Sequence, residues 1–221
     1  ALRVITSWAG RTARVPDIPG EIRIGGFGGA AGLVEYLNAE AIDMVLDATH
    51  PFASQISSNA HDACSIAKMS CLHLVRPKWE LPSSKKCIEV ENVTAAAKSI
   101  RHITKRAFLT TGRQTLGTFS GADNVWFLVR LLEKPTEPLP VENFHVTIGY
   151  PPFSIQTEKA LMKEHQIDTL ISKSSGGTVP AKITAALDLD LTIVLASAPP
   201  PPPGEHARNQ NECLKWIGAK I

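Results

Sequence analysis

The sequence has no long apolar run, little net charge and few cysteines, and each shortage excludes a class of protein. No apolar run approaches the length needed to cross a membrane, and the first residues show no signal-peptide pattern. A formal net charge of +2 is too small to favour a nucleic-acid partner. The four cysteines occur without CxxC spacing, so we expect no metal site and no disulfide framework, but reduced thiols in a cytoplasmic protein.

What remains is the composition of an ordinary globular chain, 43% hydrophobic and 20% charged. Its 221 residues suffice for one large domain or two small ones with real cores. Strand-like and helix-like segments alternate along the chain, which predicts parallel, doubly wound sheets. We therefore expect an α/β fold of two Rossmann-like parallel-sheet domains, residues 1–104 and 105–221, with a cleft between them.

The expected elements follow from the apolar pattern. In the first half, strands are predicted at residues 2–7, 21–26, 43–48 and 71–75, and helices at residues 30–38, 52–68 and 93–100. In the second half, strands are predicted at residues 106–112, 125–132, 168–173 and 191–197, and helices at residues 155–165, 180–187 and 207–219. Two Pro-rich stretches, residues 132–140 and 198–205, are expected to be connections.

The stretch DATHPFASQISSNA, residues 47–60, joins a buried strand to a helix through a polar turn. Pro51 suits the first position of the helix, where its missing N–H costs nothing, so His50 is expected at or next to the helix cap. Open α/β sheets bind ligands at such strand ends. The alternative is that Asp47 and His50 only satisfy nearby backbone groups.

Two Gly-containing turns in the first half can receive phosphate. In SWAGR, residues 7–11, backbone N–H groups and a guanidinium both complement an anion, although this stretch taken alone favours a plain turn with a solvated arginine. In GGFGGAAG, residues 25–32, the letters match the GxGxxA form of a dinucleotide loop. The alternative there is a tight glycine turn that permits close packing.

Two turns in the second half offer donors to carboxylates. LTTGRQTLGTF, residues 109–119, places Arg113 and Gln114 after a strand, where the alternative is a polar turn. LISKSSGGTVPAKITAA, residues 170–186, has the order strand, Gly-containing loop and helix, which favours anion binding. Lys182 lies in that helix, and the GKS/T order of a Walker A loop is absent.

Six stretches follow one another along the chain: SWAGRT, GGFGG, DATHPFASQISSNA, RPKW, TTGRQ and ISKSSGG. In this order they resemble the precorrin-6A reductase family of cobalamin biosynthesis, and the resemblance covers nearly the whole chain. The resemblance implies an NADPH-dependent oxidoreductase that reduces one double bond of precorrin-6A, or of its cobalt form, to give precorrin-6B. It implies a tetrapyrrole substrate with many carboxylates, and channelling to neighbouring pathway enzymes. The family usually begins with a strand and a Gly-Gly-Thr loop that this sequence lacks, and we expect truncation rather than natural loss.

The resemblance and the turn chemistry together suggest a role for each candidate residue. Arg11 is expected to bind the NADPH 2′-phosphate, and His50 either orients the cofactor or supplies the proton, with solvent as the alternative donor. The expected cofactor-binding residues are Ser7, Ala9, Gly10, Arg11, Gly26, Phe27, Gly28, Thr49, His50 and Pro51. The expected substrate-binding residues are Arg113, Gln114, Ser172, Lys173, Ser175, Gly176, Gly177 and Lys182, with Arg76 and Lys78 as further cations.

Two other functions compete with the reductase. A nucleotide- or sugar-phosphate-binding α/β protein without redox activity is suggested by SKSSGG alone. A non-catalytic Rossmann-like binding module is suggested by the missing N-terminal loop. The conjunction of DATHPFA, TTGRQ and SKSSGG in one chain favours the reductase over both.

Overall fold

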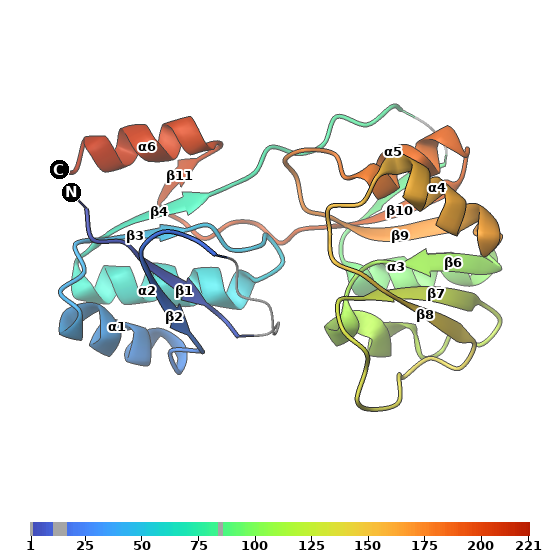
Figure 1. Cartoon of the computed structure of the whole chain (residues 1–221), viewed down its shortest axis with the longest axis horizontal. Coiled ribbons are helices and arrows are strands. Elements are labelled where there is room, and N and C mark those ends of the chain that lie inside the picture. The colour runs from blue at the N-terminus through green and yellow to red at the C-terminus, as the bar shows by residue number, and fades with distance from the viewer. Residues whose placement is uncertain (1, 11–16, 84–85) are drawn as a thin grey trace. The chain divides into compact units, whose positions relative to one another are not determined.

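A computed structural model of the chain describes residues 2–10, 17–83 and 86–221 (Figure 1). The chain divides into two compact units. Unit 1 comprises Ala1–Val75 and Pro200–Ile221, and unit 2 comprises Arg76–Pro199. Every strand pair among the described residues is parallel, so the predicted α/β fold with parallel sheets is confirmed. None of the described helices is both long and apolar enough to span a bilayer.

The described residues of unit 1 form two small sheets and three helices. Strands β1 (Ile5–Trp8) and β2 (Glu21–Ile24) form one sheet, and the other has the order β11-β4-β3. The remaining elements of this unit are β3 (Met44–Asp47), β4 (Ser70–Leu74), β11 (Glu205–Ala207), α1 (Gly29–Ala39), α2 (Ser54–Ala67) and α6 (Gln210–Gly218). Helices α1 and α2 pack side by side around Leu33, Leu37 and Ala63 (Figure 1). A separate small core joins Leu72 of β4 to Cys213 of α6.

Unit 2 is built on one six-stranded sheet with the order β5-β10-β9-β6-β7-β8. Its strands are β5 (Cys87–Val90), β6 (Arg106–Leu109), β7 (Trp126–Leu131), β8 (Phe144–Ile148), β9 (Thr169–Ser174) and β10 (Thr192–Ser197). Its helices are α3 (Val93–Ser99), α4 (Ile155–Glu164) and α5 (Ala181–Asp188), with short 3₁₀ helices η1 (Ile100–His102) and η2 (Arg113–Phe119).

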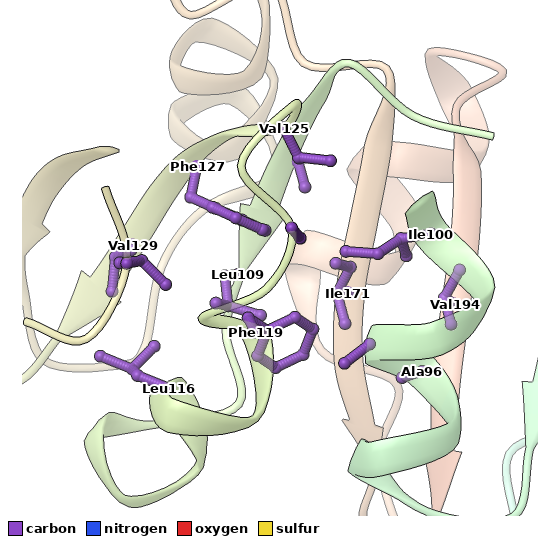
Figure 2. Packing of buried hydrophobic residues seen from close by; sticks show 14 of the residues in the cluster. Ala96, Ile100, Leu109, Leu116, Phe119, Val125, Phe127, Val129, Ile171 and Val194 are labelled. Carbon is purple, nitrogen blue, oxygen red and sulfur yellow. The ribbon is translucent and has the colours of Figure 1, made fainter. Parts of the chain in front are cut away.

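Apolar side chains cover both faces of this sheet. On one face, Ile100, Leu116 and Phe119 pack against strand residues such as Leu109 and Val129 (Figure 2). On the other face, Met162 of α4 and Ile183 of α5 belong to a second cluster that includes Phe108 and Leu170. Because the inner strands are buried on both faces, apolar residues predominate in β6, β7 and β10, whereas β9 ends in the polar residues Ser172, Lys173 and Ser174.

The strand order reverses beside β6. From β6 the chain proceeds through β7 to β8 on one side, and then crosses to β9 and β10 on the other side. The carboxyl ends of β6 and β9 are therefore neighbours at a topological switch point. Open α/β sheets bind ligands outside the strand ends at such a point.

The units do not divide at the predicted boundary between residues 104 and 105. Strand β5 precedes that boundary but belongs to unit 2, because it pairs with β10. The last residues of the chain return to unit 1, because β11 pairs with β4. Strands β5, β8 and β11 were absent from the predicted elements.

Two predicted helices begin later than expected. Helix α2 begins at Ser54 rather than at residue 52, and Pro51 lies in the preceding turn rather than at the first helical position. The turn forms because the Ala53 N–H donates to the His50 carbonyl at 2.7 Å. Helix α6 begins at Gln210 rather than at residue 207, because the Asn209 side chain caps it by accepting from the Glu212 N–H at 3.0 Å.

Candidate functional site

The turn that follows β3 carries His50 on its exposed side. The Phe52 N–H donates to His50 Nδ1 at 3.2 Å, so the backbone of the turn uses this ring nitrogen as an acceptor. A neutral imidazole that accepts at Nδ1 carries its hydrogen on Nε2. In this arrangement Nδ1 is the acceptor of the ring, and Nε2 is the nitrogen that carries the hydrogen.

Beneath this turn lies a buried polar layer between α2 and β3. Asp47 Oδ2 lies 2.9 Å from His73 Nδ1, and both side chains are buried. Asp47 also accepts from the Thr49 N–H at 3.0 Å, while the Thr49 and Ser57 hydroxyls lie 2.9 Å apart. Burial raises the pKa of Asp47, but hydrogen bonds from Ser57, His73 and Thr49 outweigh it, so this pKa lies below its ordinary value. The ionised carboxylate fixes the backbone that carries Thr49 and His50.

The imidazole of His73 has further polar neighbours in unit 1. Its Nε2 lies 3.7 Å from Cys71 Sγ, and the rings of His61 and His206 have centroids 6.1 Å and 6.0 Å from its own. Within the described part of the chain, no group of three or more histidine, cysteine, aspartate or glutamate side chains could hold a metal ion. All four cysteines are free thiols. His73 was not predicted as a site residue, although a histidine within the apolar strand CLHLV is a signal.

The GGFGG turn leads from β2 into α1 and leaves the start of this helix open. Helix α1 has no side-chain hydrogen bond at its cap and no acidic residue in its first turn. Gly28 and Gly29 have φ angles of 80° and 89°, and a Cβ at either would meet no atom within 4 Å. Unpaired N–H groups at a helix start favour an anion, and the missing side chains leave it room to approach.

Phe27 in the same turn has a packing role. The Arg23 guanidinium lies 3.8 Å from its ring centroid and donates to the carbonyls of Gly25 and Gly26 at 2.6 Å and 2.9 Å. The Phe27 ring also packs at 5.1 Å from Tyr36 of α1. Arg23, which the sequence analysis did not select, thus holds the turn in shape.

The SWAGR turn is described only in part. Ser7, Ala9 and Gly10 are exposed, and Gly10 has a φ of 70° that favours glycine. The Gly25 N–H donates to the Trp8 carbonyl at 2.8 Å, so the strand ends that lead to the two phosphate-loop candidates lie side by side. Arg11 lies outside the described residues.

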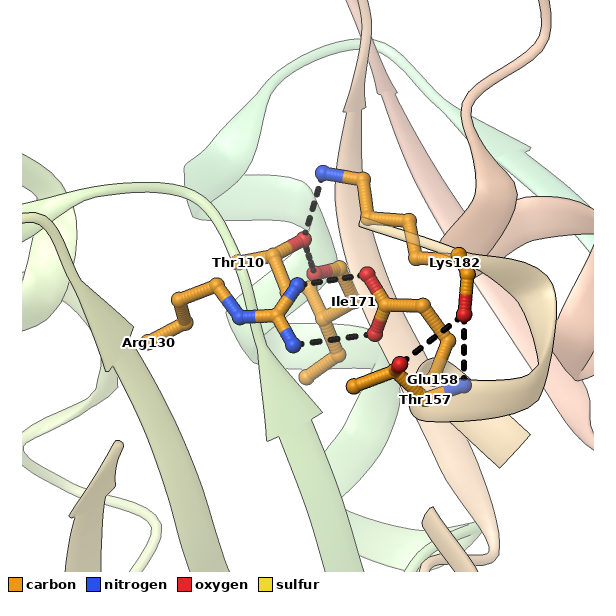
Figure 3. A network of polar contacts seen from close by, with 7 residues as sticks. Thr110, Arg130, Thr157, Glu158, Ile171 and Lys182 are labelled. Atoms are coloured by element: carbon orange, nitrogen blue, oxygen red, sulfur yellow. Dashed lines mark hydrogen bonds and ion pairs between the residues drawn. The ribbon is translucent and has the colours of Figure 1, made fainter. Parts of the chain in front are cut away.

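In unit 2, Lys182 reaches the switch point of the sheet. Lys182 Nζ donates to Thr110 Oγ1 at 3.0 Å, directly after β6, and the Thr110 hydroxyl donates to the Ile171 carbonyl at 3.0 Å (Figure 3). Arg130 and Glu158 form a two-pronged ion pair nearby, with N–O distances of 2.6 Å and 2.9 Å. The sequence analysis selected Lys182 but missed Thr110, Arg130 and Glu158.

Burial and neighbouring charge weaken the hold of Lys182 on its proton. Burial lowers the pKa of Lys182 most, Arg130 and Lys173 lower it further, and Glu158 opposes them, which leaves the pKa at about 8. Burial also lowers the pKa of Lys173. This end of the sheet therefore combines two lysine side chains with a donor network around Thr110.

The other predicted substrate-binding residues have varied surroundings. Arg113 is exposed and lies 3.1 Å from Glu137, and Gln114 beside it is exposed as well. Ser172 is fully buried, whereas Ser175 is partly buried.

The glycines of the SKSSGG loop pack against the preceding RPKW segment. The Gly177 N–H donates to the Pro77 carbonyl at 2.8 Å, and a Cβ at Gly176 would stand 2.6 Å from the same oxygen. The Gly177 N–H is thus used by the backbone, and Gly176 permits the close approach. Arg76 and Lys78, which flank Pro77, are exposed.

Together, fold and site define an α/β protein of parallel sheets, with glycine turns at strand ends in unit 1 and basic side chains at strand ends in unit 2. A family model described as precorrin-6x reductase CbiJ/CobK matches residues 1–218. The chain therefore belongs to the precorrin-6x reductase family, CbiJ/CobK. The predicted activity, that of a precorrin-6A reductase and hence of an oxidoreductase in cobalamin biosynthesis, is confirmed.

Individual relatives agree with the family model. The chain is 38% identical over 194 residues to the precorrin-6A reductase of Rhodococcus erythropolis, which covers 87% of this chain and 77% of the relative. A solved structure named CobK precorrin-6A reductase superposes with a TM-score of 0.93 at 34% identity, covering 98% of this chain and 86% of that one. The cobalt-precorrin-6A reductase of Priestia megaterium is 26% identical over 179 residues, 73% of this chain and 67% of the relative.

Proposed function

We propose that this reductase uses NADPH to convert cobalt-free precorrin-6A to precorrin-6B. The reductase family supports a reduced cofactor, and the relative named for the cobalt-free substrate is 38% identical against 26% for the one named for the cobalt form. The observation that carries the cofactor proposal is the open start of α1. There Gly28 and Gly29 leave backbone N–H groups accessible to a phosphate.

Bound NADPH supplies the hydride, and the residues of unit 1 hold it. The α1 start and the GGFGG turn bind its phosphates, and Arg11 binds the 2′-phosphate. Thr49 and His50 would lie near the nicotinamide, and His50 would orient it. Because the Phe52 N–H already occupies Nδ1, His50 is suited to orienting the cofactor rather than to supplying a proton.

Unit 2 binds the substrate at the carboxyl ends of its strands. Lys173, Lys182 and Arg113 offer positive charge to the acetate and propionate groups of the macrocycle. Each such charge-assisted contact contributes about 1.5–3 kcal/mol, which allows a weakly charged protein to hold a polyanion. The cleft between two Rossmann-like domains, the cytoplasmic location and channelling to neighbouring enzymes stay predictions.

A titration with NADPH and NADH tests the cofactor proposal. We expect NADPH to bind more tightly than NADH. We expect His50→Ala to lower the rate of hydride transfer with little change in the affinity for NADPH, because the phosphates bind elsewhere in unit 1. His102→Ala, an exposed histidine of unit 2, is the control and should behave as the wild type. Absence of NADPH binding would overturn the choice of cofactor, and normal turnover by His50→Ala would overturn the orienting role.

A further inference from the structure

The reduction needs a proton as well as a hydride, and Lys182 is a buried lysine at the strand ends of unit 2. It stands in the first turn of α5, and its side chain extends to Thr110 at the end of β6 (Figure 3). Since α5 follows β9, this contact bridges the two strand ends at the switch point. Ligands of open α/β sheets bind outside the strand ends at such a point, which is where the Lys182 ammonium group lies.

The groups around Lys182 leave its charge without a counter-ion. The Thr110 hydroxyl gives its hydrogen to the Ile171 carbonyl, so its oxygen accepts from Lys182 Nζ without neutralising it. Glu158 of α4 is paired with Arg130 of β7. Among the ion pairs of the described residues, none joins a carboxylate to Lys182.

This environment makes Lys182 a stronger acid than an ordinary lysine. Burial, together with the positive charges of Arg130 on β7 and Lys173 on β9, lowers its pKa to about 8 against the opposing effect of Glu158 on α4. Enzymes that use lysine as a general acid or base lower its pKa to about 7–8 in this way. By contrast, His50 has its Nδ1 occupied by a backbone N–H.

We propose that Lys182 is the general acid of the reaction, donating a proton from Nζ to the macrocycle as the hydride arrives. The proposal rests on the proposed function, in which NADPH is the reductant. The hydride forms a C–H bond at one end of the reduced double bond, and NADPH becomes NADP⁺. The Lys182 N–H bond breaks and a second C–H bond forms at the other end. The neutral amine then takes a proton from water, which completes the balance.

Single-turnover measurements of NADPH oxidation with precorrin-6A test this assignment. Lys182→Ala is expected to slow hydride transfer by about 100- to 10,000-fold, the usual contribution of a general acid, while NADPH binding is unchanged. Added primary amines such as methylamine are expected to restore part of the rate, in proportion to their concentration. Lys159→Met, which removes an ion-paired lysine from the neighbouring α4, is the control and should keep the wild-type rate.

Lys182→Arg separates proton donation from substrate binding. Arginine keeps the positive charge but does not release a proton in this pH range, so we expect KM to recover and the transfer rate to stay low. In the wild type, the rate is expected to fall as the pH rises through about 8, because Lys182 then loses its proton. This fall should be absent from both Lys182 variants.

Two outcomes would overturn the proposal. One is a near-normal transfer rate in Lys182→Ala, and the other is full recovery of the rate in Lys182→Arg without rescue of the alanine variant by amines. Failure of the proposed function is distinguishable, because then the wild type itself neither binds nor oxidises NADPH. In that case the same variants are compared with the reductant that the wild type accepts.

Discussion

Asp47 is a buried carboxylate whose hydrogen bonds come from the turn after β3, from the neighbouring strand β4 and from Ser57 of α2. It accepts from the Thr49 N–H and from His73, and only 8% of its surface is exposed. Removing one partner from such a network leaves buried donors without acceptors, which costs more than the bond itself contributes. One side chain thus fixes both the end of the strand and the placement of His50.

Asp47→Asn is therefore expected to lower the free energy of unfolding by about 1–3 kcal/mol at pH 7. The folded-state pKa of Asp47 lies below its ordinary value of 3.8, so its contribution is fully present above that pH and is lost as the pH falls through the folded pKa. Urea unfolding at a series of pH values checks this, since the two proteins should converge in acid. Asp43→Asn, an exposed neighbour, is the control, and an equal effect there would contradict the assignment.

The site residues that directly follow strands could be predicted from the sequence, but the side chains that they contact could not. His50 and Lys182 could be selected because strand-to-helix turns bind ligands in α/β folds. His73, Thr110 and the Arg130–Glu158 pair could not, because their roles come from register and packing between distant segments. His73 stands directly opposite Asp47 in the sheet, and local sequence does not encode that pairing.

At the scale of the element, α1 is held against the turn that precedes it by a glycine in its own second turn. A Cβ at Gly32 would lie 1.8 Å from the carbonyl oxygen of Phe27, too close for any side chain. The helix therefore cannot take its position beside the GGFGG turn unless residue 32 is glycine. The packing alternative considered for this turn and its proposed phosphate role are compatible.

Gly32→Ala is expected to destabilise the protein by about 1–3 kcal/mol, because the turn must move to relieve the overlap. NADPH affinity should fall with it, since the same backbone forms the proposed phosphate site. Gly218→Ala is the matched control: it also lies in a helix, but a Cβ there meets nothing within 4 Å. Thermal unfolding and an NADPH titration of both variants test this. A Gly32→Ala protein with unchanged stability and NADPH affinity would contradict the close approach.

The elements missed from the sequence share one physical property. Strands β5 and β8 lie at the two edges of the six-stranded sheet, and β11 lies at the edge of the smaller one. Edge strands are buried less, so β8 keeps Phe144 and Ile148 exposed and carries a histidine between them. Strands β5, β8 and β11 lack the longer apolar runs of strands such as β7, so the sequence pattern did not predict them.

At the scale of the whole molecule, unit 2 is one continuous segment whereas unit 1 is made from two. Arg76–Pro199 contains a complete six-stranded sheet with a core on each face. Unit 1 needs Pro200–Ile221, because β11 extends its sheet and α6 packs over Leu72. A boundary drawn from local pattern could not reveal this, since β4 and β11 are paired across the whole of unit 2.

We expect a fragment of residues 76–199 to fold alone and to unfold cooperatively on heating. A fragment of residues 1–75 should not, because it leaves the Leu72 side of its sheet uncovered. Joining residues 1–75 to residues 200–221 through a short Gly/Ser linker is the control and should restore a cooperative transition. Circular dichroism of the three proteins checks this, and a folded 1–75 fragment would contradict the division.

Because the end of the chain returns to unit 1, the two units are completed in a fixed order during translation. Residues 76–221 must be translated after Val75 before β11 and α6 are complete, which takes roughly 7–30 s at about 5–20 residues per second. During that interval unit 2 can complete its core, while Leu72 in residues 1–75 still lacks the packing that α6 provides. Residues 1–75 are thus synthesised before unit 2 but can complete their fold only after it.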